Sequence, residues 1–404
     1  MATIAVLGTL DTNGEEHAYI AECIRARGHE TTLIDVGTFA PPTVEPDISR
    51  ELVAAVSAID INTPIQRGDR EECISVMAIA SAALLLQLYS DRKIDGVISM
   101  GGVSGTKIGT AAMRTLPLGF PKVMVTTLAS GNTRQYVGTS DIVMFPSIVD
   151  IAGLNSISRT ICTRAAGAIC GMAEAKIEQS ETDRPIIAAS ISDNTTECVN
   201  AARDIIEAAG YEVLVFQANG NGGRSMESLI ESGMISGVLD ITTTELADEI
   251  AGGTLTAGPS RLEAAAKAGI PAVIAPGCTD IVNFGAPDTI PKQYLDRKLF
   301  VQNPELTLMR SNTQEAANIG KTLADKANAY TGPVTMMLPL KGVSALGNEG
   351  EQFFDPSADT ALFESIKQHV KPKVSVQEID AEINHSDFSL ACAVALLDML
   401  KTGK

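Results

Sequence analysis

The sequence contains no tryptophan, and aromatic residues make up only 4 % of its 404 positions. With so few aromatic side chains, stacking platforms for single-stranded nucleic acid are not expected. Basic residues are also in the minority, because 31 lysines and arginines stand against 49 aspartates and glutamates and leave a net charge of −18. Nucleic-acid backbones require clustered basic side chains, so we expect no nucleic-acid partner.

Seven cysteines are scattered along the chain, and none forms a Cys-x-x-Cys pair. An odd, dispersed set predicts neither a disulfide framework nor a structural zinc site, and it favours a cytoplasmic location. The N-terminus lacks the basic segment of a secretory signal. The most apolar stretch, Cys73 to Leu88, is shorter than the roughly 20 residues that span a bilayer. We therefore expect a buried helix or a subunit contact there, and no membrane partner.

Short apolar runs alternate with helical stretches along the whole chain, a pattern typical of β-α-β units. Ile4–Leu7 and Lys122–Thr126 are expected strands of a first half, and Ile186–Ala189 is the first expected strand of a second. The sequence therefore predicts an α/β fold of two Rossmann-like subdomains with parallel sheets, covering residues 1–180 and 181–404.

The two halves resemble each other when the first is shifted by 182 residues. Ile4 then falls on Ile186 and Gly28 on Gly210 without a gap. Residues 178–185 are polar, end in proline and suit a linker between the halves. Two facing α/β halves would create an inter-domain cleft at the carboxyl ends of their strands, where open sheets bind ligands.

Three loops rich in glycine and hydroxyl side chains follow expected strands of the first half, at Gly8–Glu16, Met100–Lys107 and Thr126–Asn132. Small residues let the backbone approach a ligand, and free N–H groups at the next helix start suit an anion. Each loop could instead be an ordinary capping turn. Asp11, with Glu15 or Glu16, could hold Mg²⁺ or a ribose hydroxyl.

A second set of polar loops follows expected strands of the second half, at Asn219–Ser225, Asp240–Glu245, Gly277–Asp280 and Lys341–Ser344. They converge on one edge if the sheet is parallel, which predicts a second polar pocket. Cys278 has no histidine nearby in the sequence to activate it, so a buried thiol is the better interpretation. The candidate catalytic groups are Thr242, Thr243, Glu245, Asp280 and Lys341, with Arg261 as a partner for an anion.

Six collinear motifs extend over essentially the whole chain and resemble those of one family. They are Gly-Thr-Leu-Asp-Thr-Asn-Gly-Glu-Glu (8–16), Gly-Gly-Val-Ser-Gly-Thr (101–106), Asp-Ile-Ala-Gly-Leu-Asn-Ser-Ile-Ser-Arg (150–159), Gly-Val-Leu-Asp-Ile-Thr-Thr-Thr-Glu-Leu-Ala-Asp (237–248), Ala-Gly-Pro-Ser-Arg-Leu-Glu-Ala-Ala (257–265) and Val-Asn-Phe-Gly (282–285). The chain is similar in these motifs to the Tm-1-like ATP-binding domain family, uncharacterised protein family UPF0261. It departs from the family pattern at Asn13, where the family usually has a lysine that could face a phosphate.

The resemblance implies a homodimer or higher homo-oligomer whose N-terminal subdomain binds ATP with Mg²⁺. Thr106 and Ser130 would be hydroxyl donors, and Asp11 and Glu16 would contact the metal. The residues expected at the nucleotide are Gly8, Thr9, Asp11, Thr12, Gly37, Gly101, Gly102, Ser104, Gly105, Thr106, Thr127, Ser130 and Gly131.

Three classes of function stay open at this point. The leading hypothesis is a cytosolic protein that binds ATP and Mg²⁺ through the glycine and hydroxyl loops. The alternative is an enzyme that acts on a small organic acid or phosphorylated metabolite in the inter-domain cleft, so the expected partners are a nucleotide and a small anionic metabolite. The third class is a non-catalytic regulatory or scaffolding protein, in which ATP sets a conformation or an oligomer.

Overall fold

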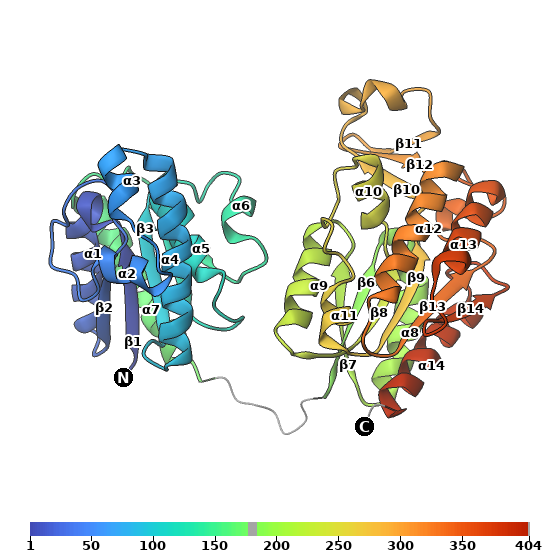
Figure 1. The fold of residues 1–404 in the computed structure, drawn as a ribbon, viewed down its shortest axis with the longest axis horizontal. Helices are drawn as coiled ribbons and strands as arrows, with labels where there is room; N and C mark the ends of the chain where they lie inside the picture. Colours follow the sequence, from blue (N-terminus) through green and yellow to red (C-terminus); the bar gives the residue numbers. More distant parts are fainter. Residues whose placement is uncertain (177–183, 403–404) are drawn as a thin grey trace. The chain divides into compact units, whose positions relative to one another are not determined.

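The computed structural model describes residues 1–176 and 184–402 of the chain. The chain divides into two compact units, Met1–Gln179 and Ser180–Lys404. Each unit has its own parallel sheet with helices on both faces, which confirms the predicted α/β fold class (Figure 1). The predicted linker at 178–185 lies, up to residue 183, outside the described residues.

The first unit has five parallel strands in the order β2-β1-β3-β4-β5. They are β1 (Thr3–Gly8), β2 (Glu30–Asp35), β3 (Gly96–Gly101), β4 (Lys122–Thr126) and β5 (Val143–Pro146). Every residue of β3 and β4 is buried, as expected for a parallel sheet that is covered on both faces.

Two groups of helices cover the sheet of the first unit. On one face α1 (Leu10–Arg25) packs against α7 (Ser156–Glu174), and on the other α4 (Arg70–Ser90) packs against α5 (Val103–Met113). The shorter helices are α2 (Arg50–Val56), α3 (Asn62–Arg67) and α6 (Arg134–Val137).

Helix α4 contains the apolar stretch noted in the sequence. Within the described residues it is the one helix long and apolar enough to cross a membrane. Met77 and Leu85, both fully buried, pack it into the core of the first unit. Its opposite face leaves Ile79 exposed, so the helix is a core element with an apolar outer side.

The second unit has six parallel strands in the order β14-β13-β9-β8-β6-β7. They are β6 (Ile186–Ile191), β7 (Glu212–Gln217), β8 (Ile235–Thr242), β9 (Ala272–Gly277), β13 (Val334–Pro339) and β14 (Ser375–Ile379). The sequence did not predict the small antiparallel sheet, in the order β10-β12-β11. Its strands are β10 (Ile281–Phe284), β11 (Leu299–Asn303) and β12 (Leu306–Arg310).

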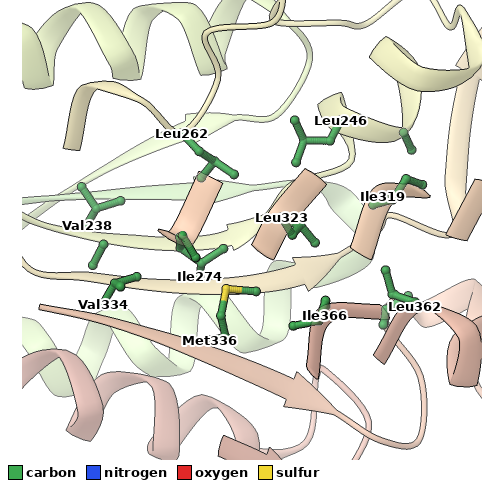
Figure 2. Packing of buried hydrophobic residues seen from close by; sticks show 14 of the residues in the cluster. Val238, Leu246, Leu262, Ile274, Ile319, Leu323, Val334, Met336, Leu362 and Ile366 are labelled. Carbon is green, nitrogen blue, oxygen red and sulfur yellow. The ribbon is translucent and has the colours of Figure 1, made fainter. Parts of the chain in front are cut away.

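Helices again cover both faces of the larger sheet in the second unit. One face carries α8 (Thr196–Ala208) and α14 (Ser386–Thr402). The other face carries α9 (Asn221–Glu231), α10 (Glu245–Ala251), α11 (Ala264–Ala268), α12 (Thr313–Asn328) and α13 (Pro356–His369). Figure 2 shows the core of this second face, where Leu323 and Ile366 pack with Ile274 and Met336 of the sheet. Short 3₁₀ helices occur at η1 (Asp193–Thr195), η2 (Pro287–Thr289), η3 (Lys292–Tyr294) and η4 (Ala345–Gly347).

The two large sheets share their strand order around the first strand, β2-β1-β3-β4 in one and β7-β6-β8-β9 in the other. The pairing of the strands nevertheless corrects the gap-free superposition of the two halves by one residue in the first strand. Ile4 pairs with Thr31 and Gly96, whereas Ile187 pairs with Val213 and Gly237. The counterpart of Ile4 is therefore Ile187, one residue beyond the position given by the shift of 182.

Two helical glycines should respond oppositely to substitution by alanine. A Cβ on Gly320 of α12 would lie 2.5 Å from the carbonyl oxygen of Leu362 in α13, whereas a Cβ on Gly171 of α7 meets no atom within 4 Å. We expect Gly320→Ala to lower the free energy of unfolding by about 1–3 kcal/mol through overpacking. Gly171→Ala should raise it by up to about 1 kcal/mol through helix propensity. Denaturant unfolding of both variants measures the two signs, and a stabilised Gly320→Ala protein would show that the α12–α13 contact is looser than described.

Candidate functional site

The order of strands reverses between β1 and β3 in the first unit. From β1 the chain crosses to β2 on one side, and it later returns to β3 on the other side. The connections leave these two carboxyl ends in opposite directions, which opens a crevice where open α/β sheets bind ligands. A cavity of about 540 Å³ lies there, lined mainly by residues that follow β1 and β3.

The cavity brings together six of the residues predicted to bind a nucleotide. They are Thr9, Asp11, Thr12, Gly102, Ser104 and Gly105. Gly102 is the N-cap of α5, and Ser104 and Gly105 lie in its first turn. The first N–H groups of a helix have no partner within the helix and carry a partial positive charge. This wall of the cavity therefore suits an anion.

Two of the predicted glycines act on packing and do not line the cavity. A Cβ on Gly101 would lie 2.7 Å from the Cα of Gly105, and a Cβ on Gly8 would lie 2.2 Å from Nε2 of His17. His17 is fully buried, and burial lowers the pKa of its imidazole, which favours the neutral ring. Gly8 and Gly101 thus allow β1 and β3 to pass close to α1 and α5.

The hydroxyl of Thr106 is also turned to the interior. Thr106 is fully buried, its Oγ1 donates to the carbonyl of Gly101 at 3.1 Å, and it lies 2.7 Å from Oγ1 of Thr126. Thr127 lies next to Gly102, with its Oγ1 4.0 Å from where a Cβ on that glycine would stand. Ser130 and Gly131 are exposed and are not among the residues that line the cavity. The loop after β4 therefore supports the loop after β3.

The two predicted metal ligands lie in different surroundings. Oδ2 of Asp11 accepts the backbone N–H groups of Thr38, Phe39 and Ala40 at 3.1, 2.7 and 3.2 Å. Its Oδ1 is buried and has no hydrogen-bond partner in the described part of the chain. Glu16 is 2 % exposed, accepts the N–H of Gly153 at 2.7 Å and does not line the cavity. Among the described residues no group of three or more His, Cys, Asp and Glu side chains could hold a metal.

Gly37 and Asp35, at the end of β2, constrain the position of Asp11. Oδ1 of Asp35 accepts the N–H groups of Gly37 at 2.8 Å and Leu10 at 3.2 Å. A Cβ on Gly37 would lie 2.7 Å from Cγ of Asp11, so only glycine lets the strand end approach so closely. Burial raises the pKa of Asp35, and the neighbouring charge of Asp11 adds to this rise.

The structure adds Arg70 and Phe39, cavity residues that the sequence did not point to, and places Asn13 of the first predicted loop beside them. Arg70, at the start of α4, is the one basic side chain among the described residues that line the cavity. Phe39 lines the cavity although its side chain is 79 % exposed. Asn13 interrupts α1 with φ −131° and ψ 31°, and its Nδ2 donates to the carbonyl of Ile151 at 3.3 Å. Arg70 and Phe39 come from segments far from the glycine loops, so no local motif could have indicated them.

Comparison with known proteins assigns the family. A model of the N-terminal domain of uncharacterised protein family UPF0261 matches residues 2–178, and a model of its C-terminal domain matches residues 184–400. The chain belongs to the UPF0261 family. A UPF0261 protein of Clostridium tetani is 46 % identical over 98 % of this chain and 99 % of its own length. The ToMV resistance protein Tm-1(GCR237) of Solanum lycopersicum is 34 % identical over 97 % of this chain and 55 % of its own length.

In the second unit of this UPF0261 chain, four of the five predicted catalytic groups are buried and hydrogen-bonded to the chain's own atoms. Thr242 and Thr243 are fully buried. Oγ1 of Thr242 lies 2.7 Å from Oγ1 of Thr195, and Oγ1 of Thr243 donates to the carbonyl of Ala275 at 2.9 Å. The Thr242 hydroxyl links the end of β8 to η1, and the Thr243 hydroxyl links it to β9.

Glu245 and Arg261 belong to a buried ionic cluster. Nε of Arg261 donates to Oε2 of Glu245 at 2.6 Å, and both terminal nitrogens donate to Asp240 at 2.6 Å. Glu227 completes the cluster at 3.1 Å, and burial raises the pKa of its carboxyl. Arg261 is 1 % exposed, so its guanidinium is not available to an external anion.

Asp280 and Lys341 lie apart from this cluster. Asp280 is 1 % exposed, and one of its carboxylate oxygens accepts the hydroxyl of Ser344 at 2.6 Å. Lys341 is exposed, lies 2.9 Å from Asp380 and borders a separate cavity of about 760 Å³ over α13. Burial raises the pKa of the Cys278 thiol, which agrees with an inert buried cysteine.

Asp248 should make the stability of the second unit depend on pH. Its carboxylate accepts two hydrogen bonds from Asn283, yet burial raises its pKa from 3.8 to about 7. A carboxyl whose pKa is raised in the folded state favours folding when protonated, so this contribution is lost as pH rises from about 4 to about 7. The wild-type free energy of unfolding should therefore fall by up to about 4 kcal/mol over this pH range because of Asp248. Asp248→Asn cannot ionise, so we expect this part of the fall to be absent in the variant. Denaturant unfolding at about pH 4 and pH 8 measures this change in unfolding free energy, and Asp204→Asn, at an exposed position, is the control. The same change between the two pH values in both variants would contradict the assignment to Asp248.

Proposed function

We propose that the first unit binds ATP together with Mg²⁺ in the cavity between the carboxyl ends of β1 and β3. The observation that carries the proposal is the meeting of the α5 N-terminus and Arg70 around one cavity. Backbone N–H groups and a guanidinium are the donors that recognise phosphate oxygens. A volume of about 540 Å³ falls within the usual range of small-molecule sites.

The acidic composition of the chain is compatible with this anionic ligand. A net charge of −18 opposes polyanions at the surface, but helix N–H groups attract phosphate without any basic side chain. Arg70 adds one positive charge, and its guanidinium has no ion pair among the residues that the structure describes. The site therefore supports a phosphate ligand inside an acidic protein.

The residues around the cavity fit Mg²⁺ only in part. This ion keeps several waters and usually binds one or two carboxylates plus the phosphates. The unpartnered Oδ1 of Asp11 is a carboxylate oxygen suited to this role, whereas Glu16 is bonded to Gly153. We propose that phosphates and water hold most of the ion, with Asp11 beside them. When bound, Mg²⁺ would neutralise phosphate charge.

Binding is a better-supported role for this protein than catalysis. Four of the five catalytic candidates in the second unit are buried and already hydrogen-bonded to the chain's own groups. A cytoplasmic location remains part of the proposal, supported by seven cysteines that all lie in described segments as free thiols.

The proposal includes a homodimer that forms through the outer side of α4. Ile79 and Leu86 on this helix are 61 % and 45 % exposed, and an apolar face of this kind favours contact with another protein surface. We expect the double substitution Ile79→Lys and Leu86→Lys to halve the mass measured by light scattering. Ile157→Lys, at an exposed position of α7, is the control. An unchanged dimer in the double variant would exclude α4 as the contact.

Calorimetric titration of the full chain with ATP and Mg²⁺ tests nucleotide binding, and the Arg70→Ala variant tests the contribution of the Arg70 guanidinium to it. Charge-assisted hydrogen bonds contribute about 1.5–3 kcal/mol, so Arg70→Ala should weaken ATP binding by roughly 10- to 150-fold. Arg67→Ala is the matched control, because it removes the same charge from an exposed site at which Arg67 pairs with Glu72. The absence of heat in the wild-type titration would refute the proposed function.

A further inference from the structure

Phe39 exposes an aromatic ring at the cavity between the carboxyl ends of β1 and β3 in the first unit. Its side chain is 79 % exposed and lines the cavity that also contains Arg70 and the first turn of α5. A single exposed phenylalanine is common on protein surfaces and needs no explanation by itself. What does require an explanation here is that several hydrogen bonds fix the backbone of Phe39.

Five hydrogen bonds hold the segment that carries Phe39. One carboxylate oxygen of Asp11 accepts the N–H groups of Thr38, Phe39 and Ala40. The N–H of Gly37 donates to Asp35 at 2.8 Å, and Arg50 donates to the carbonyl of Ala40 at 2.7 Å. The ring is therefore presented from a rigid support and does not depend on a flexible surface loop.

A phenylalanine on a fixed backbone has only two side-chain torsions left to order, so stacking a flat ligand on its ring costs little entropy. Every nucleobase has a π-face, so stacking on an aromatic side chain accepts any base. Phosphate-binding groups and an aromatic ring in one cavity match a ligand that carries both a phosphate chain and a base. A sugar phosphate or an inorganic phosphate would leave the ring unused.

We propose that Phe39 is the platform on which the base of the bound nucleotide stacks, and that Asp11 is the positioning residue that holds this platform. The inference rests on the proposed function, because it concerns the same cavity. It adds to that function the residue that would contact the base of the nucleotide. It also gives the carboxylate of Asp11 a role that does not require the metal.

Titration of the full chain with ATP and with inorganic tripolyphosphate, both with Mg²⁺, tests the platform. Base stacking on an aromatic side chain corresponds to about a 5- to 150-fold change in affinity. We expect Phe39→Ala to weaken ATP binding by such a factor and to leave tripolyphosphate binding unchanged, whereas Phe39→Trp keeps the affinity for ATP. Phe354→Ala is the matched control, because Phe354 is a partly exposed phenylalanine of the second unit.

Asp11→Asn tests the positioning role separately. If Asp11 holds the platform, the variant weakens ATP binding in the absence of Mg²⁺ as well as in its presence, because the Phe39 segment loses its support in both cases. A loss that occurs only with Mg²⁺ would assign Asp11 to the metal and overturn its positioning role.

The outcomes separate the inference from the proposed function. If the wild-type chain binds neither ATP nor tripolyphosphate, the proposed function fails and the platform fails with it. If the wild-type chain binds ATP and Phe39→Ala binds it equally well, the platform is refuted while nucleotide binding stands. Wild-type binding of tripolyphosphate as tight as that of ATP would also refute base stacking.

Discussion

Parallel strand pairing is the constraint on which the rest of this molecule depends. All strands of the two large sheets run parallel to their neighbours. Their crossover helices then cover both faces, and every strand-end loop of a sheet comes to the same edge. In the first unit the reversal of order at β1 and β3 leaves part of that edge uncovered. The α5 N-terminus, Arg70 and Phe39 meet at this opening although they are distant in sequence.

The sequence predicted β1, β4 and β6 because a buried parallel strand has a strong local signal. Ile-Ala-Val-Leu in β1 and Lys-Val-Met-Val-Thr in β4 are short apolar runs bounded by turn residues, and the structure places strands there. The antiparallel strands β10, β11 and β12 escaped prediction because they rely on pairing with each other, and the edge strands β5 and β14 escaped it because they are partly exposed. Local pattern therefore gave the layers of the fold, while the small sheet depends on tertiary pairing.

The candidate site was predictable only where its chemistry is local. Gly102, Ser104 and Gly105 follow a strand directly, and small residues at a helix start are a local pattern compatible with an anion site. Thr106 carries the same local signal, yet its hydroxyl bonds to Thr126 in the interior. A polar side chain after a strand can face a ligand or close the protein on itself, and its partner decides between the two. That partner is often 20 or more residues away, as Thr126 is from Thr106, so sequence spacing alone could not distinguish the cases.

In the second unit, the carboxylate of Glu245 binds the N–H groups at a helix N-terminus, whereas the corresponding groups of α5 in the first unit face a cavity. Oε1 of Glu245 accepts the N–H groups of Gly220 and Gly223, the N-cap and first turn of α9, at 2.7 and 3.2 Å. A Cβ on Gly223 would lie 2.3 Å from this carboxylate, so glycine is required there. The carboxylate thus takes the place at a helix N-terminus that an external phosphate could occupy, and Arg261 balances its charge. The same combination of glycine and helix N-terminus therefore has opposite meanings in the two units. In the second, the anion is part of the chain; in the first, the α5 N-terminus lines a cavity, and the acidic residue of that lining, Asp11, hydrogen-bonds to the segment Thr38–Ala40 instead.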